Sequence, residues 1–318
     1  MKKITAIIIL VFSLISCKDH RQGNVHPIQK AENYKGSCNS NDPGKILDAP
    51  EIIINLLNEM DNVSIYSAYE LNDNEKQLFT DYYNLLPAKY KDIITRKVIG
   101  IYFISNFLGG GMTLPVYDNN GAMYTVLFFN PNILHKTISE WINFRDNSAF
   151  TNDSAISVII ECNSNYYALI HTLVHEAAHV YDYYNHITPF TEESLKDDKT
   201  KFPTEFVNGV WNDYDIPIAE YDFEDRKRIS FYELGEKIDR KSATEIFTLL
   251  KRTPFSSLYG STTWAEDFAE SFAWYYLKSY CSINYITTID DENNSITYDP
   301  NENELAKKRY KIFEELVK

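Results

Sequence analysis

One pattern restricts this 318-residue chain more than any other: His175 and His179 stand four residues apart inside a long helical pattern at residues 166–184. Side chains four apart leave the same face of a helix, so both imidazoles can reach one metal ion. Glu176 follows the first histidine, about 100° round the helix, where its carboxylate can reach a metal-bound water without being a ligand. The residues between and after are small or apolar. We therefore expect a closely packed helix that carries a metal site.

The class of such a site depends on its third ligand. A metzincin would need glycine at position 182 and histidine at position 185, but the chain has Asp182 and Asn185, with His186 one residue out of place. That class is excluded. A thermolysin-like site would use a glutamate roughly 20 residues after the second histidine. Asp197 and Asp198 lie there, in a charged stretch that is typical of a solvated loop.

His171 offers another pairing, because it lies four residues before His175. That pair lacks an acid in its second position. We therefore expect His171 to be a packed or solvated helical histidine and not a ligand.

A second helical pattern, at residues 263–280, offers better third ligands. It follows a Ser/Thr-rich cap, and its apolar stripe is bordered by Glu266 and Glu270, four residues apart. Carboxylates beside a buried face are costly unless they bind something. Helical spacing alone does not choose between the two.

Together these motifs resemble a known family. His175-Glu176-x-x-His179, followed by Tyr259 and, seven residues later, by Glu266 in Ala-Glu-x-Phe-Ala-Glu, is similar to the gluzincin metallopeptidases of the anthrax lethal factor and Pro-Pro endopeptidase group. The resemblance implies an α+β, zincin-like metallopeptidase domain with a small sheet and an active-site helix. It also implies that His175, His179 and Glu266 bind Zn²⁺, that Glu176 is the general base and that Tyr259 lines the reaction site.

The same resemblance implies a substrate and a place for it. Glu270 would accept a hydrogen bond from the second ring nitrogen of a ligand histidine. A peptide or protein substrate would lie along an edge strand above the helix, for which residues 123–129 are the candidate, and zinc-dependent endopeptidase activity would cleave it. The alternative is a non-catalytic envelope lipoprotein that binds a peptide or glycan in a zincin-like cleft. Glu176 argues against it, because a structural zinc site needs no acid beside the water position.

The first 20 residues read as a targeting segment and not as part of the fold. Lys2 and Lys3 precede an apolar stretch at residues 4–15 that is too short to span a membrane. Cys17 directly follows Leu-Ile-Ser, which resembles the lipobox of bacterial lipoproteins. It implies a signal peptide at residues 1–16, lipidation of Cys17 and a bacterial cell envelope location, periplasmic or surface-exposed. A cleaved secretory signal with an incidental cysteine is the alternative.

The remaining chain divides into a polar segment at residues 17–45, expected to be a flexible tether, and a peptidase domain at residues 46–318 with an insertion at about 186–255. Further helical patterns occupy residues 49–60, 74–86, 242–251 and 304–317, and strand patterns occupy residues 97–105, 123–129 and 156–162.

Charge and cysteine content limit the partners. The 45 acidic and 31 basic residues give a net charge of -14, which disfavours nucleic acid and anionic membrane surfaces as partners. We expect a monomer that contacts the membrane through its lipid anchor only. Besides Cys17, the chain has Cys38, Cys162 and Cys281, which allow one disulfide without indicating which two residues pair.

Overall fold

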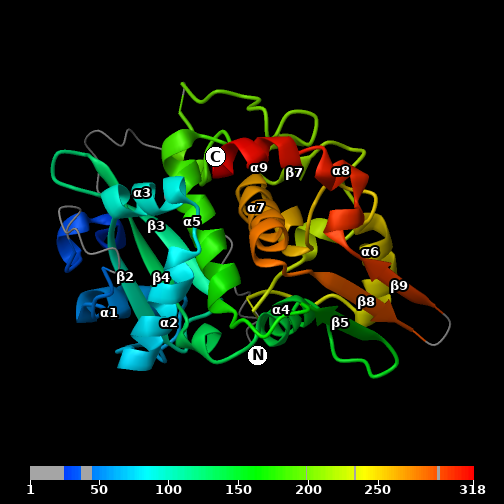
Figure 1. The fold of residues 1–318 in the computed structure, drawn as a ribbon, viewed down its shortest axis with the longest axis horizontal. Helices are drawn as coiled ribbons and strands as arrows, with labels where there is room; N and C mark the ends of the chain where they lie inside the picture. Colours follow the sequence, from blue (N-terminus) through cyan, green and yellow to red (C-terminus); the bar gives the residue numbers. More distant parts are fainter. Residues whose placement is uncertain (1–24, 37–44, 198, 233, 292–293) are drawn as a thin grey trace, which may run out of the picture.

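The computed structural model of the chain describes residues 25–36, 45–197, 199–232, 234–291 and 294–318. It is an α+β structure, as the sequence predicts, with one β-sheet on one side of helices α5 and α7 and a smaller sheet on the other (Figure 1). The expected signal peptide and Cys17 lie outside the described residues. Within the described ranges, no helix has both the length and the apolar composition needed to cross a membrane.

The first sheet has the strand order β1-β2-β4-β3. Its strands are β1 (Ser67–Ala68), β2 (Val98–Ser105), β3 (Gly111–Tyr117) and β4 (Met123–Phe129), and the accompanying helices are α1 (Glu51–Met60), α2 (Asp73–Asn84) and α3 (Ala88–Lys97). Alternate residues of a strand face opposite sides of its sheet. Ile101 and Phe103 of β2 therefore join the hydrophobic cluster that includes α5, whereas Tyr102 and Ile104 join a second cluster against α1.

The edge of this sheet differs from the sequence prediction. Residues 123–129 form β4, as expected, but β4 lies between β2 and β3 and is not the edge strand. The edge strand next to β4 is β3, which the sequence analysis did not predict because glycines precede it and Pro115 interrupts it. Proline lacks a backbone N–H and is therefore confined largely to edge strands, which is where Pro115 lies.

The second sheet is antiparallel, with the strand order β5-β8-β9. Its region comprises α4 (Ile138–Asn147), β5 (Ser157–Glu161), α6 (Ala243–Leu250), β8 (Ile286–Asp290), β9 (Ser295–Tyr298), α8 (Glu304–Lys307) and α9 (Tyr310–Val317). The helix predicted over residues 304–317 is thus two helices. Arg309 lies at the break, and its guanidinium donates to the carboxylate of Asp267 in the core.

Helices α5 (Leu169–Asn185) and α7 (Trp264–Cys281) pack against each other in the middle of the domain. Both confirm the predicted helices, within a few residues at each end, and most of their residues are buried. An apolar helix with this little exposed surface is stabilised mainly by tertiary packing.

The insertion at residues 186–255 is loop-rich, as expected, and includes the short strands β6 (Trp211–Asp213) and β7 (Ile216–Pro217). It is nevertheless part of the same core, because Trp211 is buried and donates from its indole to Asp267 on α7. The buried Arg226 donates to the carbonyl of Ser261, just before α7. The insertion therefore holds the beginning of α7, and it cannot swing away as a separate lid without breaking these contacts.

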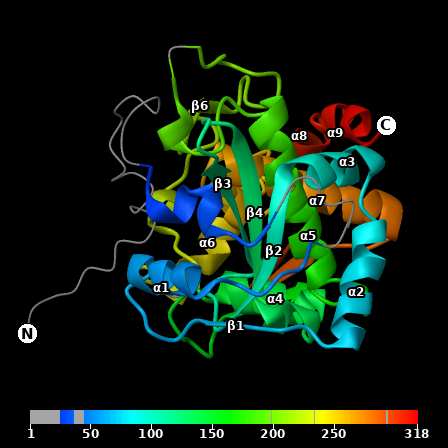
Figure 2. The same cartoon turned by 90° about the vertical axis from the view of Figure 1, so that its left-hand side faces the viewer.

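Residues 25–36 lie beside β3 and not away from the domain (Figure 2). Ile28 and Tyr34 are buried in the cluster against α1, and Lys30 forms an isolated parallel bridge with Tyr117 at the end of β3. The expectation of a flexible tether is therefore wrong for this segment. The polar composition of the segment gave no sign that Ile28 and Tyr34 would be buried.

Two of the cysteines lie in the described part of the chain. Cys162 is buried and Cys281 is partly exposed, and both are free thiols. The two are therefore not paired with each other. Cys38 lies outside the described residues.

Candidate metal centre

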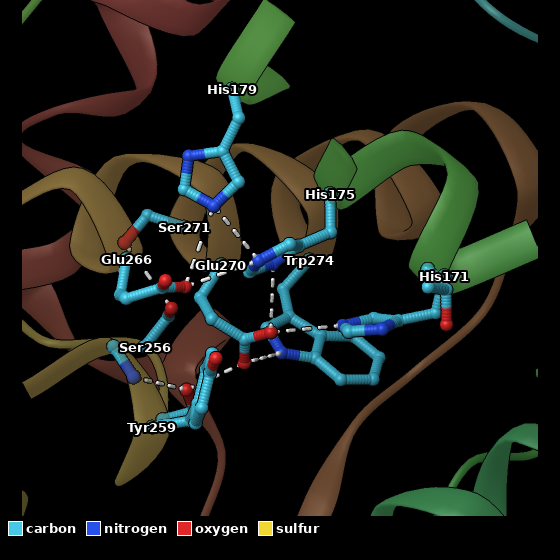
Figure 3. Close-up of polar contacts among 12 residues, drawn as sticks. His171, His175, His179, Ser256, Tyr259, Glu266, Glu270, Ser271 and Trp274 are labelled. Carbon is cyan, nitrogen blue, oxygen red and sulfur yellow. Dashed lines mark hydrogen bonds and ion pairs between the residues drawn. The ribbon is translucent and has the colours of Figure 1, made fainter. Parts of the chain in front are cut away.

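Helix α5 carries the two candidate ligand histidines. His175 and His179 lie one turn apart, and both side chains extend from α5 toward Glu266 (Figure 3). Ala177 and Ala178 are fully buried, which lets α5 pack closely with its neighbours.

Helix α7 presents the candidate third ligand in its first turn. The N-cap residue is Thr263, whose Oγ1 accepts a hydrogen bond from the backbone N–H of Glu266 at 3.2 Å. The partial positive charge at a helix N-terminus stabilises a carboxylate at this position. The Ser/Thr-rich start noted in the sequence thus fixes where Glu266 leaves the helix.

The three side chains converge on one point. Glu266 Oε2 lies 3.1 Å from Nε2 of His175 and 3.5 Å from Nε2 of His179, and the two Nε2 atoms are 3.1 Å apart. Atoms that bind one tetrahedral zinc ion at about 2.0–2.1 Å stand roughly 3.3 Å from one another. The observed spacing would fit three ligands on one face of a zinc tetrahedron.

The chemistry of the donor set also fits a metal ion. Glu266 Oε2 is buried and accepts no hydrogen bond of normal geometry from the described residues. Two imidazoles and one carboxylate are the ligand set of a catalytic zinc site that keeps a fourth position open. Side-chain exposure is 8% for His175 and 25% for Glu266, so the open side lies toward the carboxylate.

The electrostatics of the group favour a cation. Burial opposes a charge on His175, but the adjacent carboxylates of Glu266 and Glu270 raise its pKa to about 10. Although burial raises the pKa of Glu266, the neighbouring His179 and His175 hold it well below its usual value. The carboxylates that favour a proton on the imidazole would equally favour a metal ion in the place of that proton.

Glu176 stands beside this group and outside it. Its side chain is buried, and Thr113 of β3 donates from Oγ1 to Glu176 Oε2 at 2.8 Å. Burial raises the pKa of Glu176, which makes its carboxylate a better proton acceptor. Gly111 lies against it, because a Cβ at Gly111 would be only 2.8 Å from Glu176 Oε1.

Glu270 lies one turn beyond Glu266, behind the histidines. Its Oε1 is 3.2 Å from Nδ1 of His175 and 3.3 Å from Nε2 of His171. His171 is buried, and its ring centroid lies 4.4 Å from that of Trp274. His171 is therefore a packed histidine. It does not belong to the metal group, which consists of the candidate ligands His175, His179 and Glu266.

Tyr259 lies in a short 3-10 turn (Tyr259–Ser261) before α7, and its ring centroid is 6.0 Å from that of His175. Burial, and then the nearby Glu266, raise the pKa of its phenol well above the ordinary value. The hydroxyl therefore stays protonated at neutral pH and can donate a hydrogen bond.

A cavity of about 140 Å³ opens beside His175 and Glu176. Its walls include the backbone of the glycines at 109–111, the charged side chains of Arg145 and Glu270, and three aromatic rings, those of Trp141, Tyr232 and Tyr259. Tyr232 comes from the insertion and has a left-handed backbone with φ 57°. A tyrosine in this conformation is uncommon and costs energy, which indicates that the surrounding structure fixes the position of its ring.

Sequence reasoning missed three residues that shape this site. Thr113 holds Glu176, Tyr232 lines the cavity, and Arg145 of α4 is buried against Glu270. The glycine run before Thr113 could have indicated a close approach of backbone to the helix. Neither Arg145 nor Tyr232 belongs to a local pattern that could have revealed it.

The rejected ligand candidates lie elsewhere. Asp182, Asn185, His186 and Asp197 line a separate cavity of about 590 Å³ at the C-terminal end of α5. Asp182 is buried and accepts hydrogen bonds from the backbone N–H and the hydroxyl of Thr188.

Comparison with known proteins identifies no relative: no family model matches the chain, and neither a curated protein nor a solved structure matches it.

Proposed function

We propose that this protein is a zinc-dependent endopeptidase with a zincin-like fold, of the gluzincin type that its motifs resemble. The observation that carries the proposal is the convergence of His175 Nε2, His179 Nε2 and Glu266 Oε2, with the buried carboxylate of Glu176 beside them. A metal site that served only the fold would not need this additional carboxylate, which costs free energy to bury.

The proposed chemistry divides between the metal and the chain. A zinc ion held by the two histidines and Glu266 would supply a Lewis acid that polarises a peptide carbonyl and acidifies water. Glu176 accepts the proton from the attacking water and later delivers it to the leaving nitrogen. The protonated Tyr259 donates a hydrogen bond to the oxygen on which negative charge develops.

Among the described residues, only Lys30 bridges to the outer edge of β3, which supports a peptide substrate. Since Pro115 pairs opposite Thr125 and has no N–H to donate, its nitrogen side faces away from β4. Every second residue of an edge strand directs its backbone N–H and C=O groups to the same side. Gly111 and Thr113 therefore direct theirs to the outer edge of β3, the side that the nitrogen of Pro115 faces. An extended peptide could add to the sheet there, beside Glu176. Lys30 already occupies the far end of that edge.

The location follows from the N-terminal pattern. We propose that Cys17 carries a lipid and that the domain works at the cell envelope, where it would meet exported proteins or peptides.

The test combines metal analysis with cleavage of an unbiased peptide library. The chain from residue 21 onward should bind one zinc ion per molecule and cleave peptides. Glu176→Gln should abolish cleavage while zinc stays bound, because the amide cannot accept the proton but the three ligands remain. Glu161→Gln, an exposed change on β5, is the matched control and should leave both unchanged.

Three outcomes would contradict the proposal. Persistent absence of stoichiometric zinc would exclude the metal site, and activity within a few-fold of the parent in Glu176→Gln would exclude the assigned base. Zinc binding without cleavage of any library peptide would favour the non-catalytic binding protein.

A further inference from the structure

Arg145 lies behind the metal group and does not belong to it. Its side chain is 3% exposed, and its Nη1 and Nη2 donate to Glu270 Oε1 at 2.9 Å and to Glu270 Oε2 at 3.2 Å. Its Nε donates to Asp146 Oδ1 at 2.7 Å. A guanidinium that grips a carboxylate through two parallel hydrogen bonds fixes the plane of that carboxylate, which a lysine cannot do.

The Glu270 carboxylate, which Arg145 binds, also contacts His175, the first candidate ligand. Glu270 Oε1, which accepts from Arg145, is the atom that lies 3.2 Å from His175 Nδ1 (Figure 3). Ser257 and Trp274 donate to the other oxygen, at 2.6 and 3.2 Å. The partner of one ring nitrogen sets the tautomer of a histidine and the direction of its other nitrogen. The fixed plane of Glu270 therefore holds its Oε1 beside His175 Nδ1 at an ion-pair distance, and would through this contact set the direction of His175 Nε2.

The same guanidinium contacts Tyr259. Its Cζ lies 4.8 Å from the centroid of the Tyr259 ring, a cation–π distance. One buried side chain from α4 thus contacts both the carboxylate behind His175 and the phenol in front of it.

We propose that Arg145 is a positioning residue that sets the orientation of the His175 ring through Glu270 and the place of the Tyr259 ring through direct stacking. The inference rests on the proposed metal site. It assigns Arg145 no contact with the metal. Because Arg145 also lines the cavity beside His175, a direct contact with substrate would appear as a change in KM.

The chain contains a matched control whose carboxylate partner lies on the same helix, α7, as Glu270. Arg309 is also buried and also grips a carboxylate of α7 through two hydrogen bonds, to Asp267 Oδ2 at 2.5 Å and Oδ1 at 2.9 Å. Among the described residues, this pair makes no hydrogen bond, ion pair or ring contact with His175 or Tyr259. Arg145→Lys and Arg309→Lys therefore each remove a pair of hydrogen bonds from a guanidinium to one carboxylate of α7. Only the carboxylate bound by Arg145 contacts a candidate metal ligand, His175.

The experiment measures zinc affinity by chelator competition, the visible spectrum of the Co²⁺-loaded protein and the urea stability of the metal-free protein. We expect both variants to lose stability. Only Arg145→Lys should lose zinc affinity, by about 10-fold, the lower end for changes around a metal ligand. Only Arg145→Lys should alter the Co²⁺ spectrum, because only there does a ligand ring turn.

A third readout separates the two contacts of Arg145. At saturating zinc, kcat of Arg145→Lys on a peptide that the parent cleaves should stay below that of Arg309→Lys with KM unchanged, because Tyr259 is displaced. If Arg145→Lys does not fold, Arg145→Gln, which keeps one amide donor toward Glu270, is measured in its place.

Equal zinc affinity and equal Co²⁺ spectra in the two variants would overturn the inference and leave the proposed function intact. Absence of zinc binding in the parent protein would instead overturn the proposed function, and this inference with it.

Discussion

A single methyl group at Gly111 tests whether the edge strand sets the position of the proposed base. A Cβ there would lie 2.8 Å from Glu176 Oε1, 2.9 Å from Glu176 Cγ and 3.0 Å from Thr172 Cγ2, against 3.4 Å for ordinary contact. The Glu176 carboxylate must therefore move by about 0.5 Å or more, or β3 must lift. Misplacement of about 1 Å can cost a catalytic group about 100-fold in rate.

We expect Gly111→Ala to lower kcat by about 10- to 100-fold and to destabilise the fold by about 1–3 kcal/mol through overpacking. Zinc content should not change, because the methyl group meets no ligand. The assay compares kcat and KM on a library peptide that the parent cleaves, together with bound zinc and urea unfolding.

Gly121→Ala is the control for loss of a glycine. Gly121 lies in the loop between β3 and β4 with φ 78°, and a Cβ there would meet no atom within 4 Å. It should cost stability, by roughly 1–2 kcal/mol of backbone strain, and leave kcat unchanged. A parental kcat in folded Gly111→Ala would refute the reasoning, since the position of Glu176 would then not matter.

Two further predictions concern the ligand choice and a buried acid. Chelator competition should rank Glu266→Gln below Glu270→Gln in zinc affinity, because the first change weakens a proposed ligand. Glu270 is a partner of a ligand histidine, and loss of such a partner costs about 10- to 100-fold. The reverse order would shift the ligand by one turn and remove the reason for choosing Tyr259. Burial raises the pKa of Asp182 to about 6, against hydrogen bonds from Thr188 that lower it, so the folded protein binds a proton that the unfolded chain, with its ordinary value of 3.8, does not. The contribution of Asp182 to stability should therefore increase as the pH falls from 7 to about 4. Asp182→Asn should remove that contribution, so the variant gains less stability over this range and is more stable than the parent at pH 7 by up to about 3 kcal/mol in urea unfolding. A slope equal to that of the parent would contradict the assignment to Asp182.

Local periodicity predicted the helices that carry the candidate ligands. The i, i+4 spacing of His175 and His179, and the apolar stripe beside Glu266, depend only on neighbours in the sequence, and both helices form as predicted. Which elements lie beside them depends on distant pairings. The edge position of β3 follows from its pairing with β4 and from the parallel pairing of β4 with β2, which no local pattern contains.

The supporting residues were beyond sequence reasoning for a similar reason. Arg145 and Glu270 are 125 residues apart in the chain, and an arginine outside any recognised pattern is expected to face solvent. Tyr232 reaches the cavity from a loop whose backbone is left-handed at that residue. Such positions are fixed by the assembled core and not by propensity.

If Cys17 carries the proposed lipid, the docking of residues 25–36 on the sheet limits how far the domain can be from the membrane. Seven residues separate Cys17 from Val25. Even fully extended, the chain between them reaches at most about 29 Å, whereas a tether running to Lys45 would reach about 100 Å. A lipid on Cys17 would thus keep the domain within about one domain radius of the bilayer. Its reach would be confined to a thin layer at the membrane surface, and proteins deeper in the surrounding compartment would have to come to it.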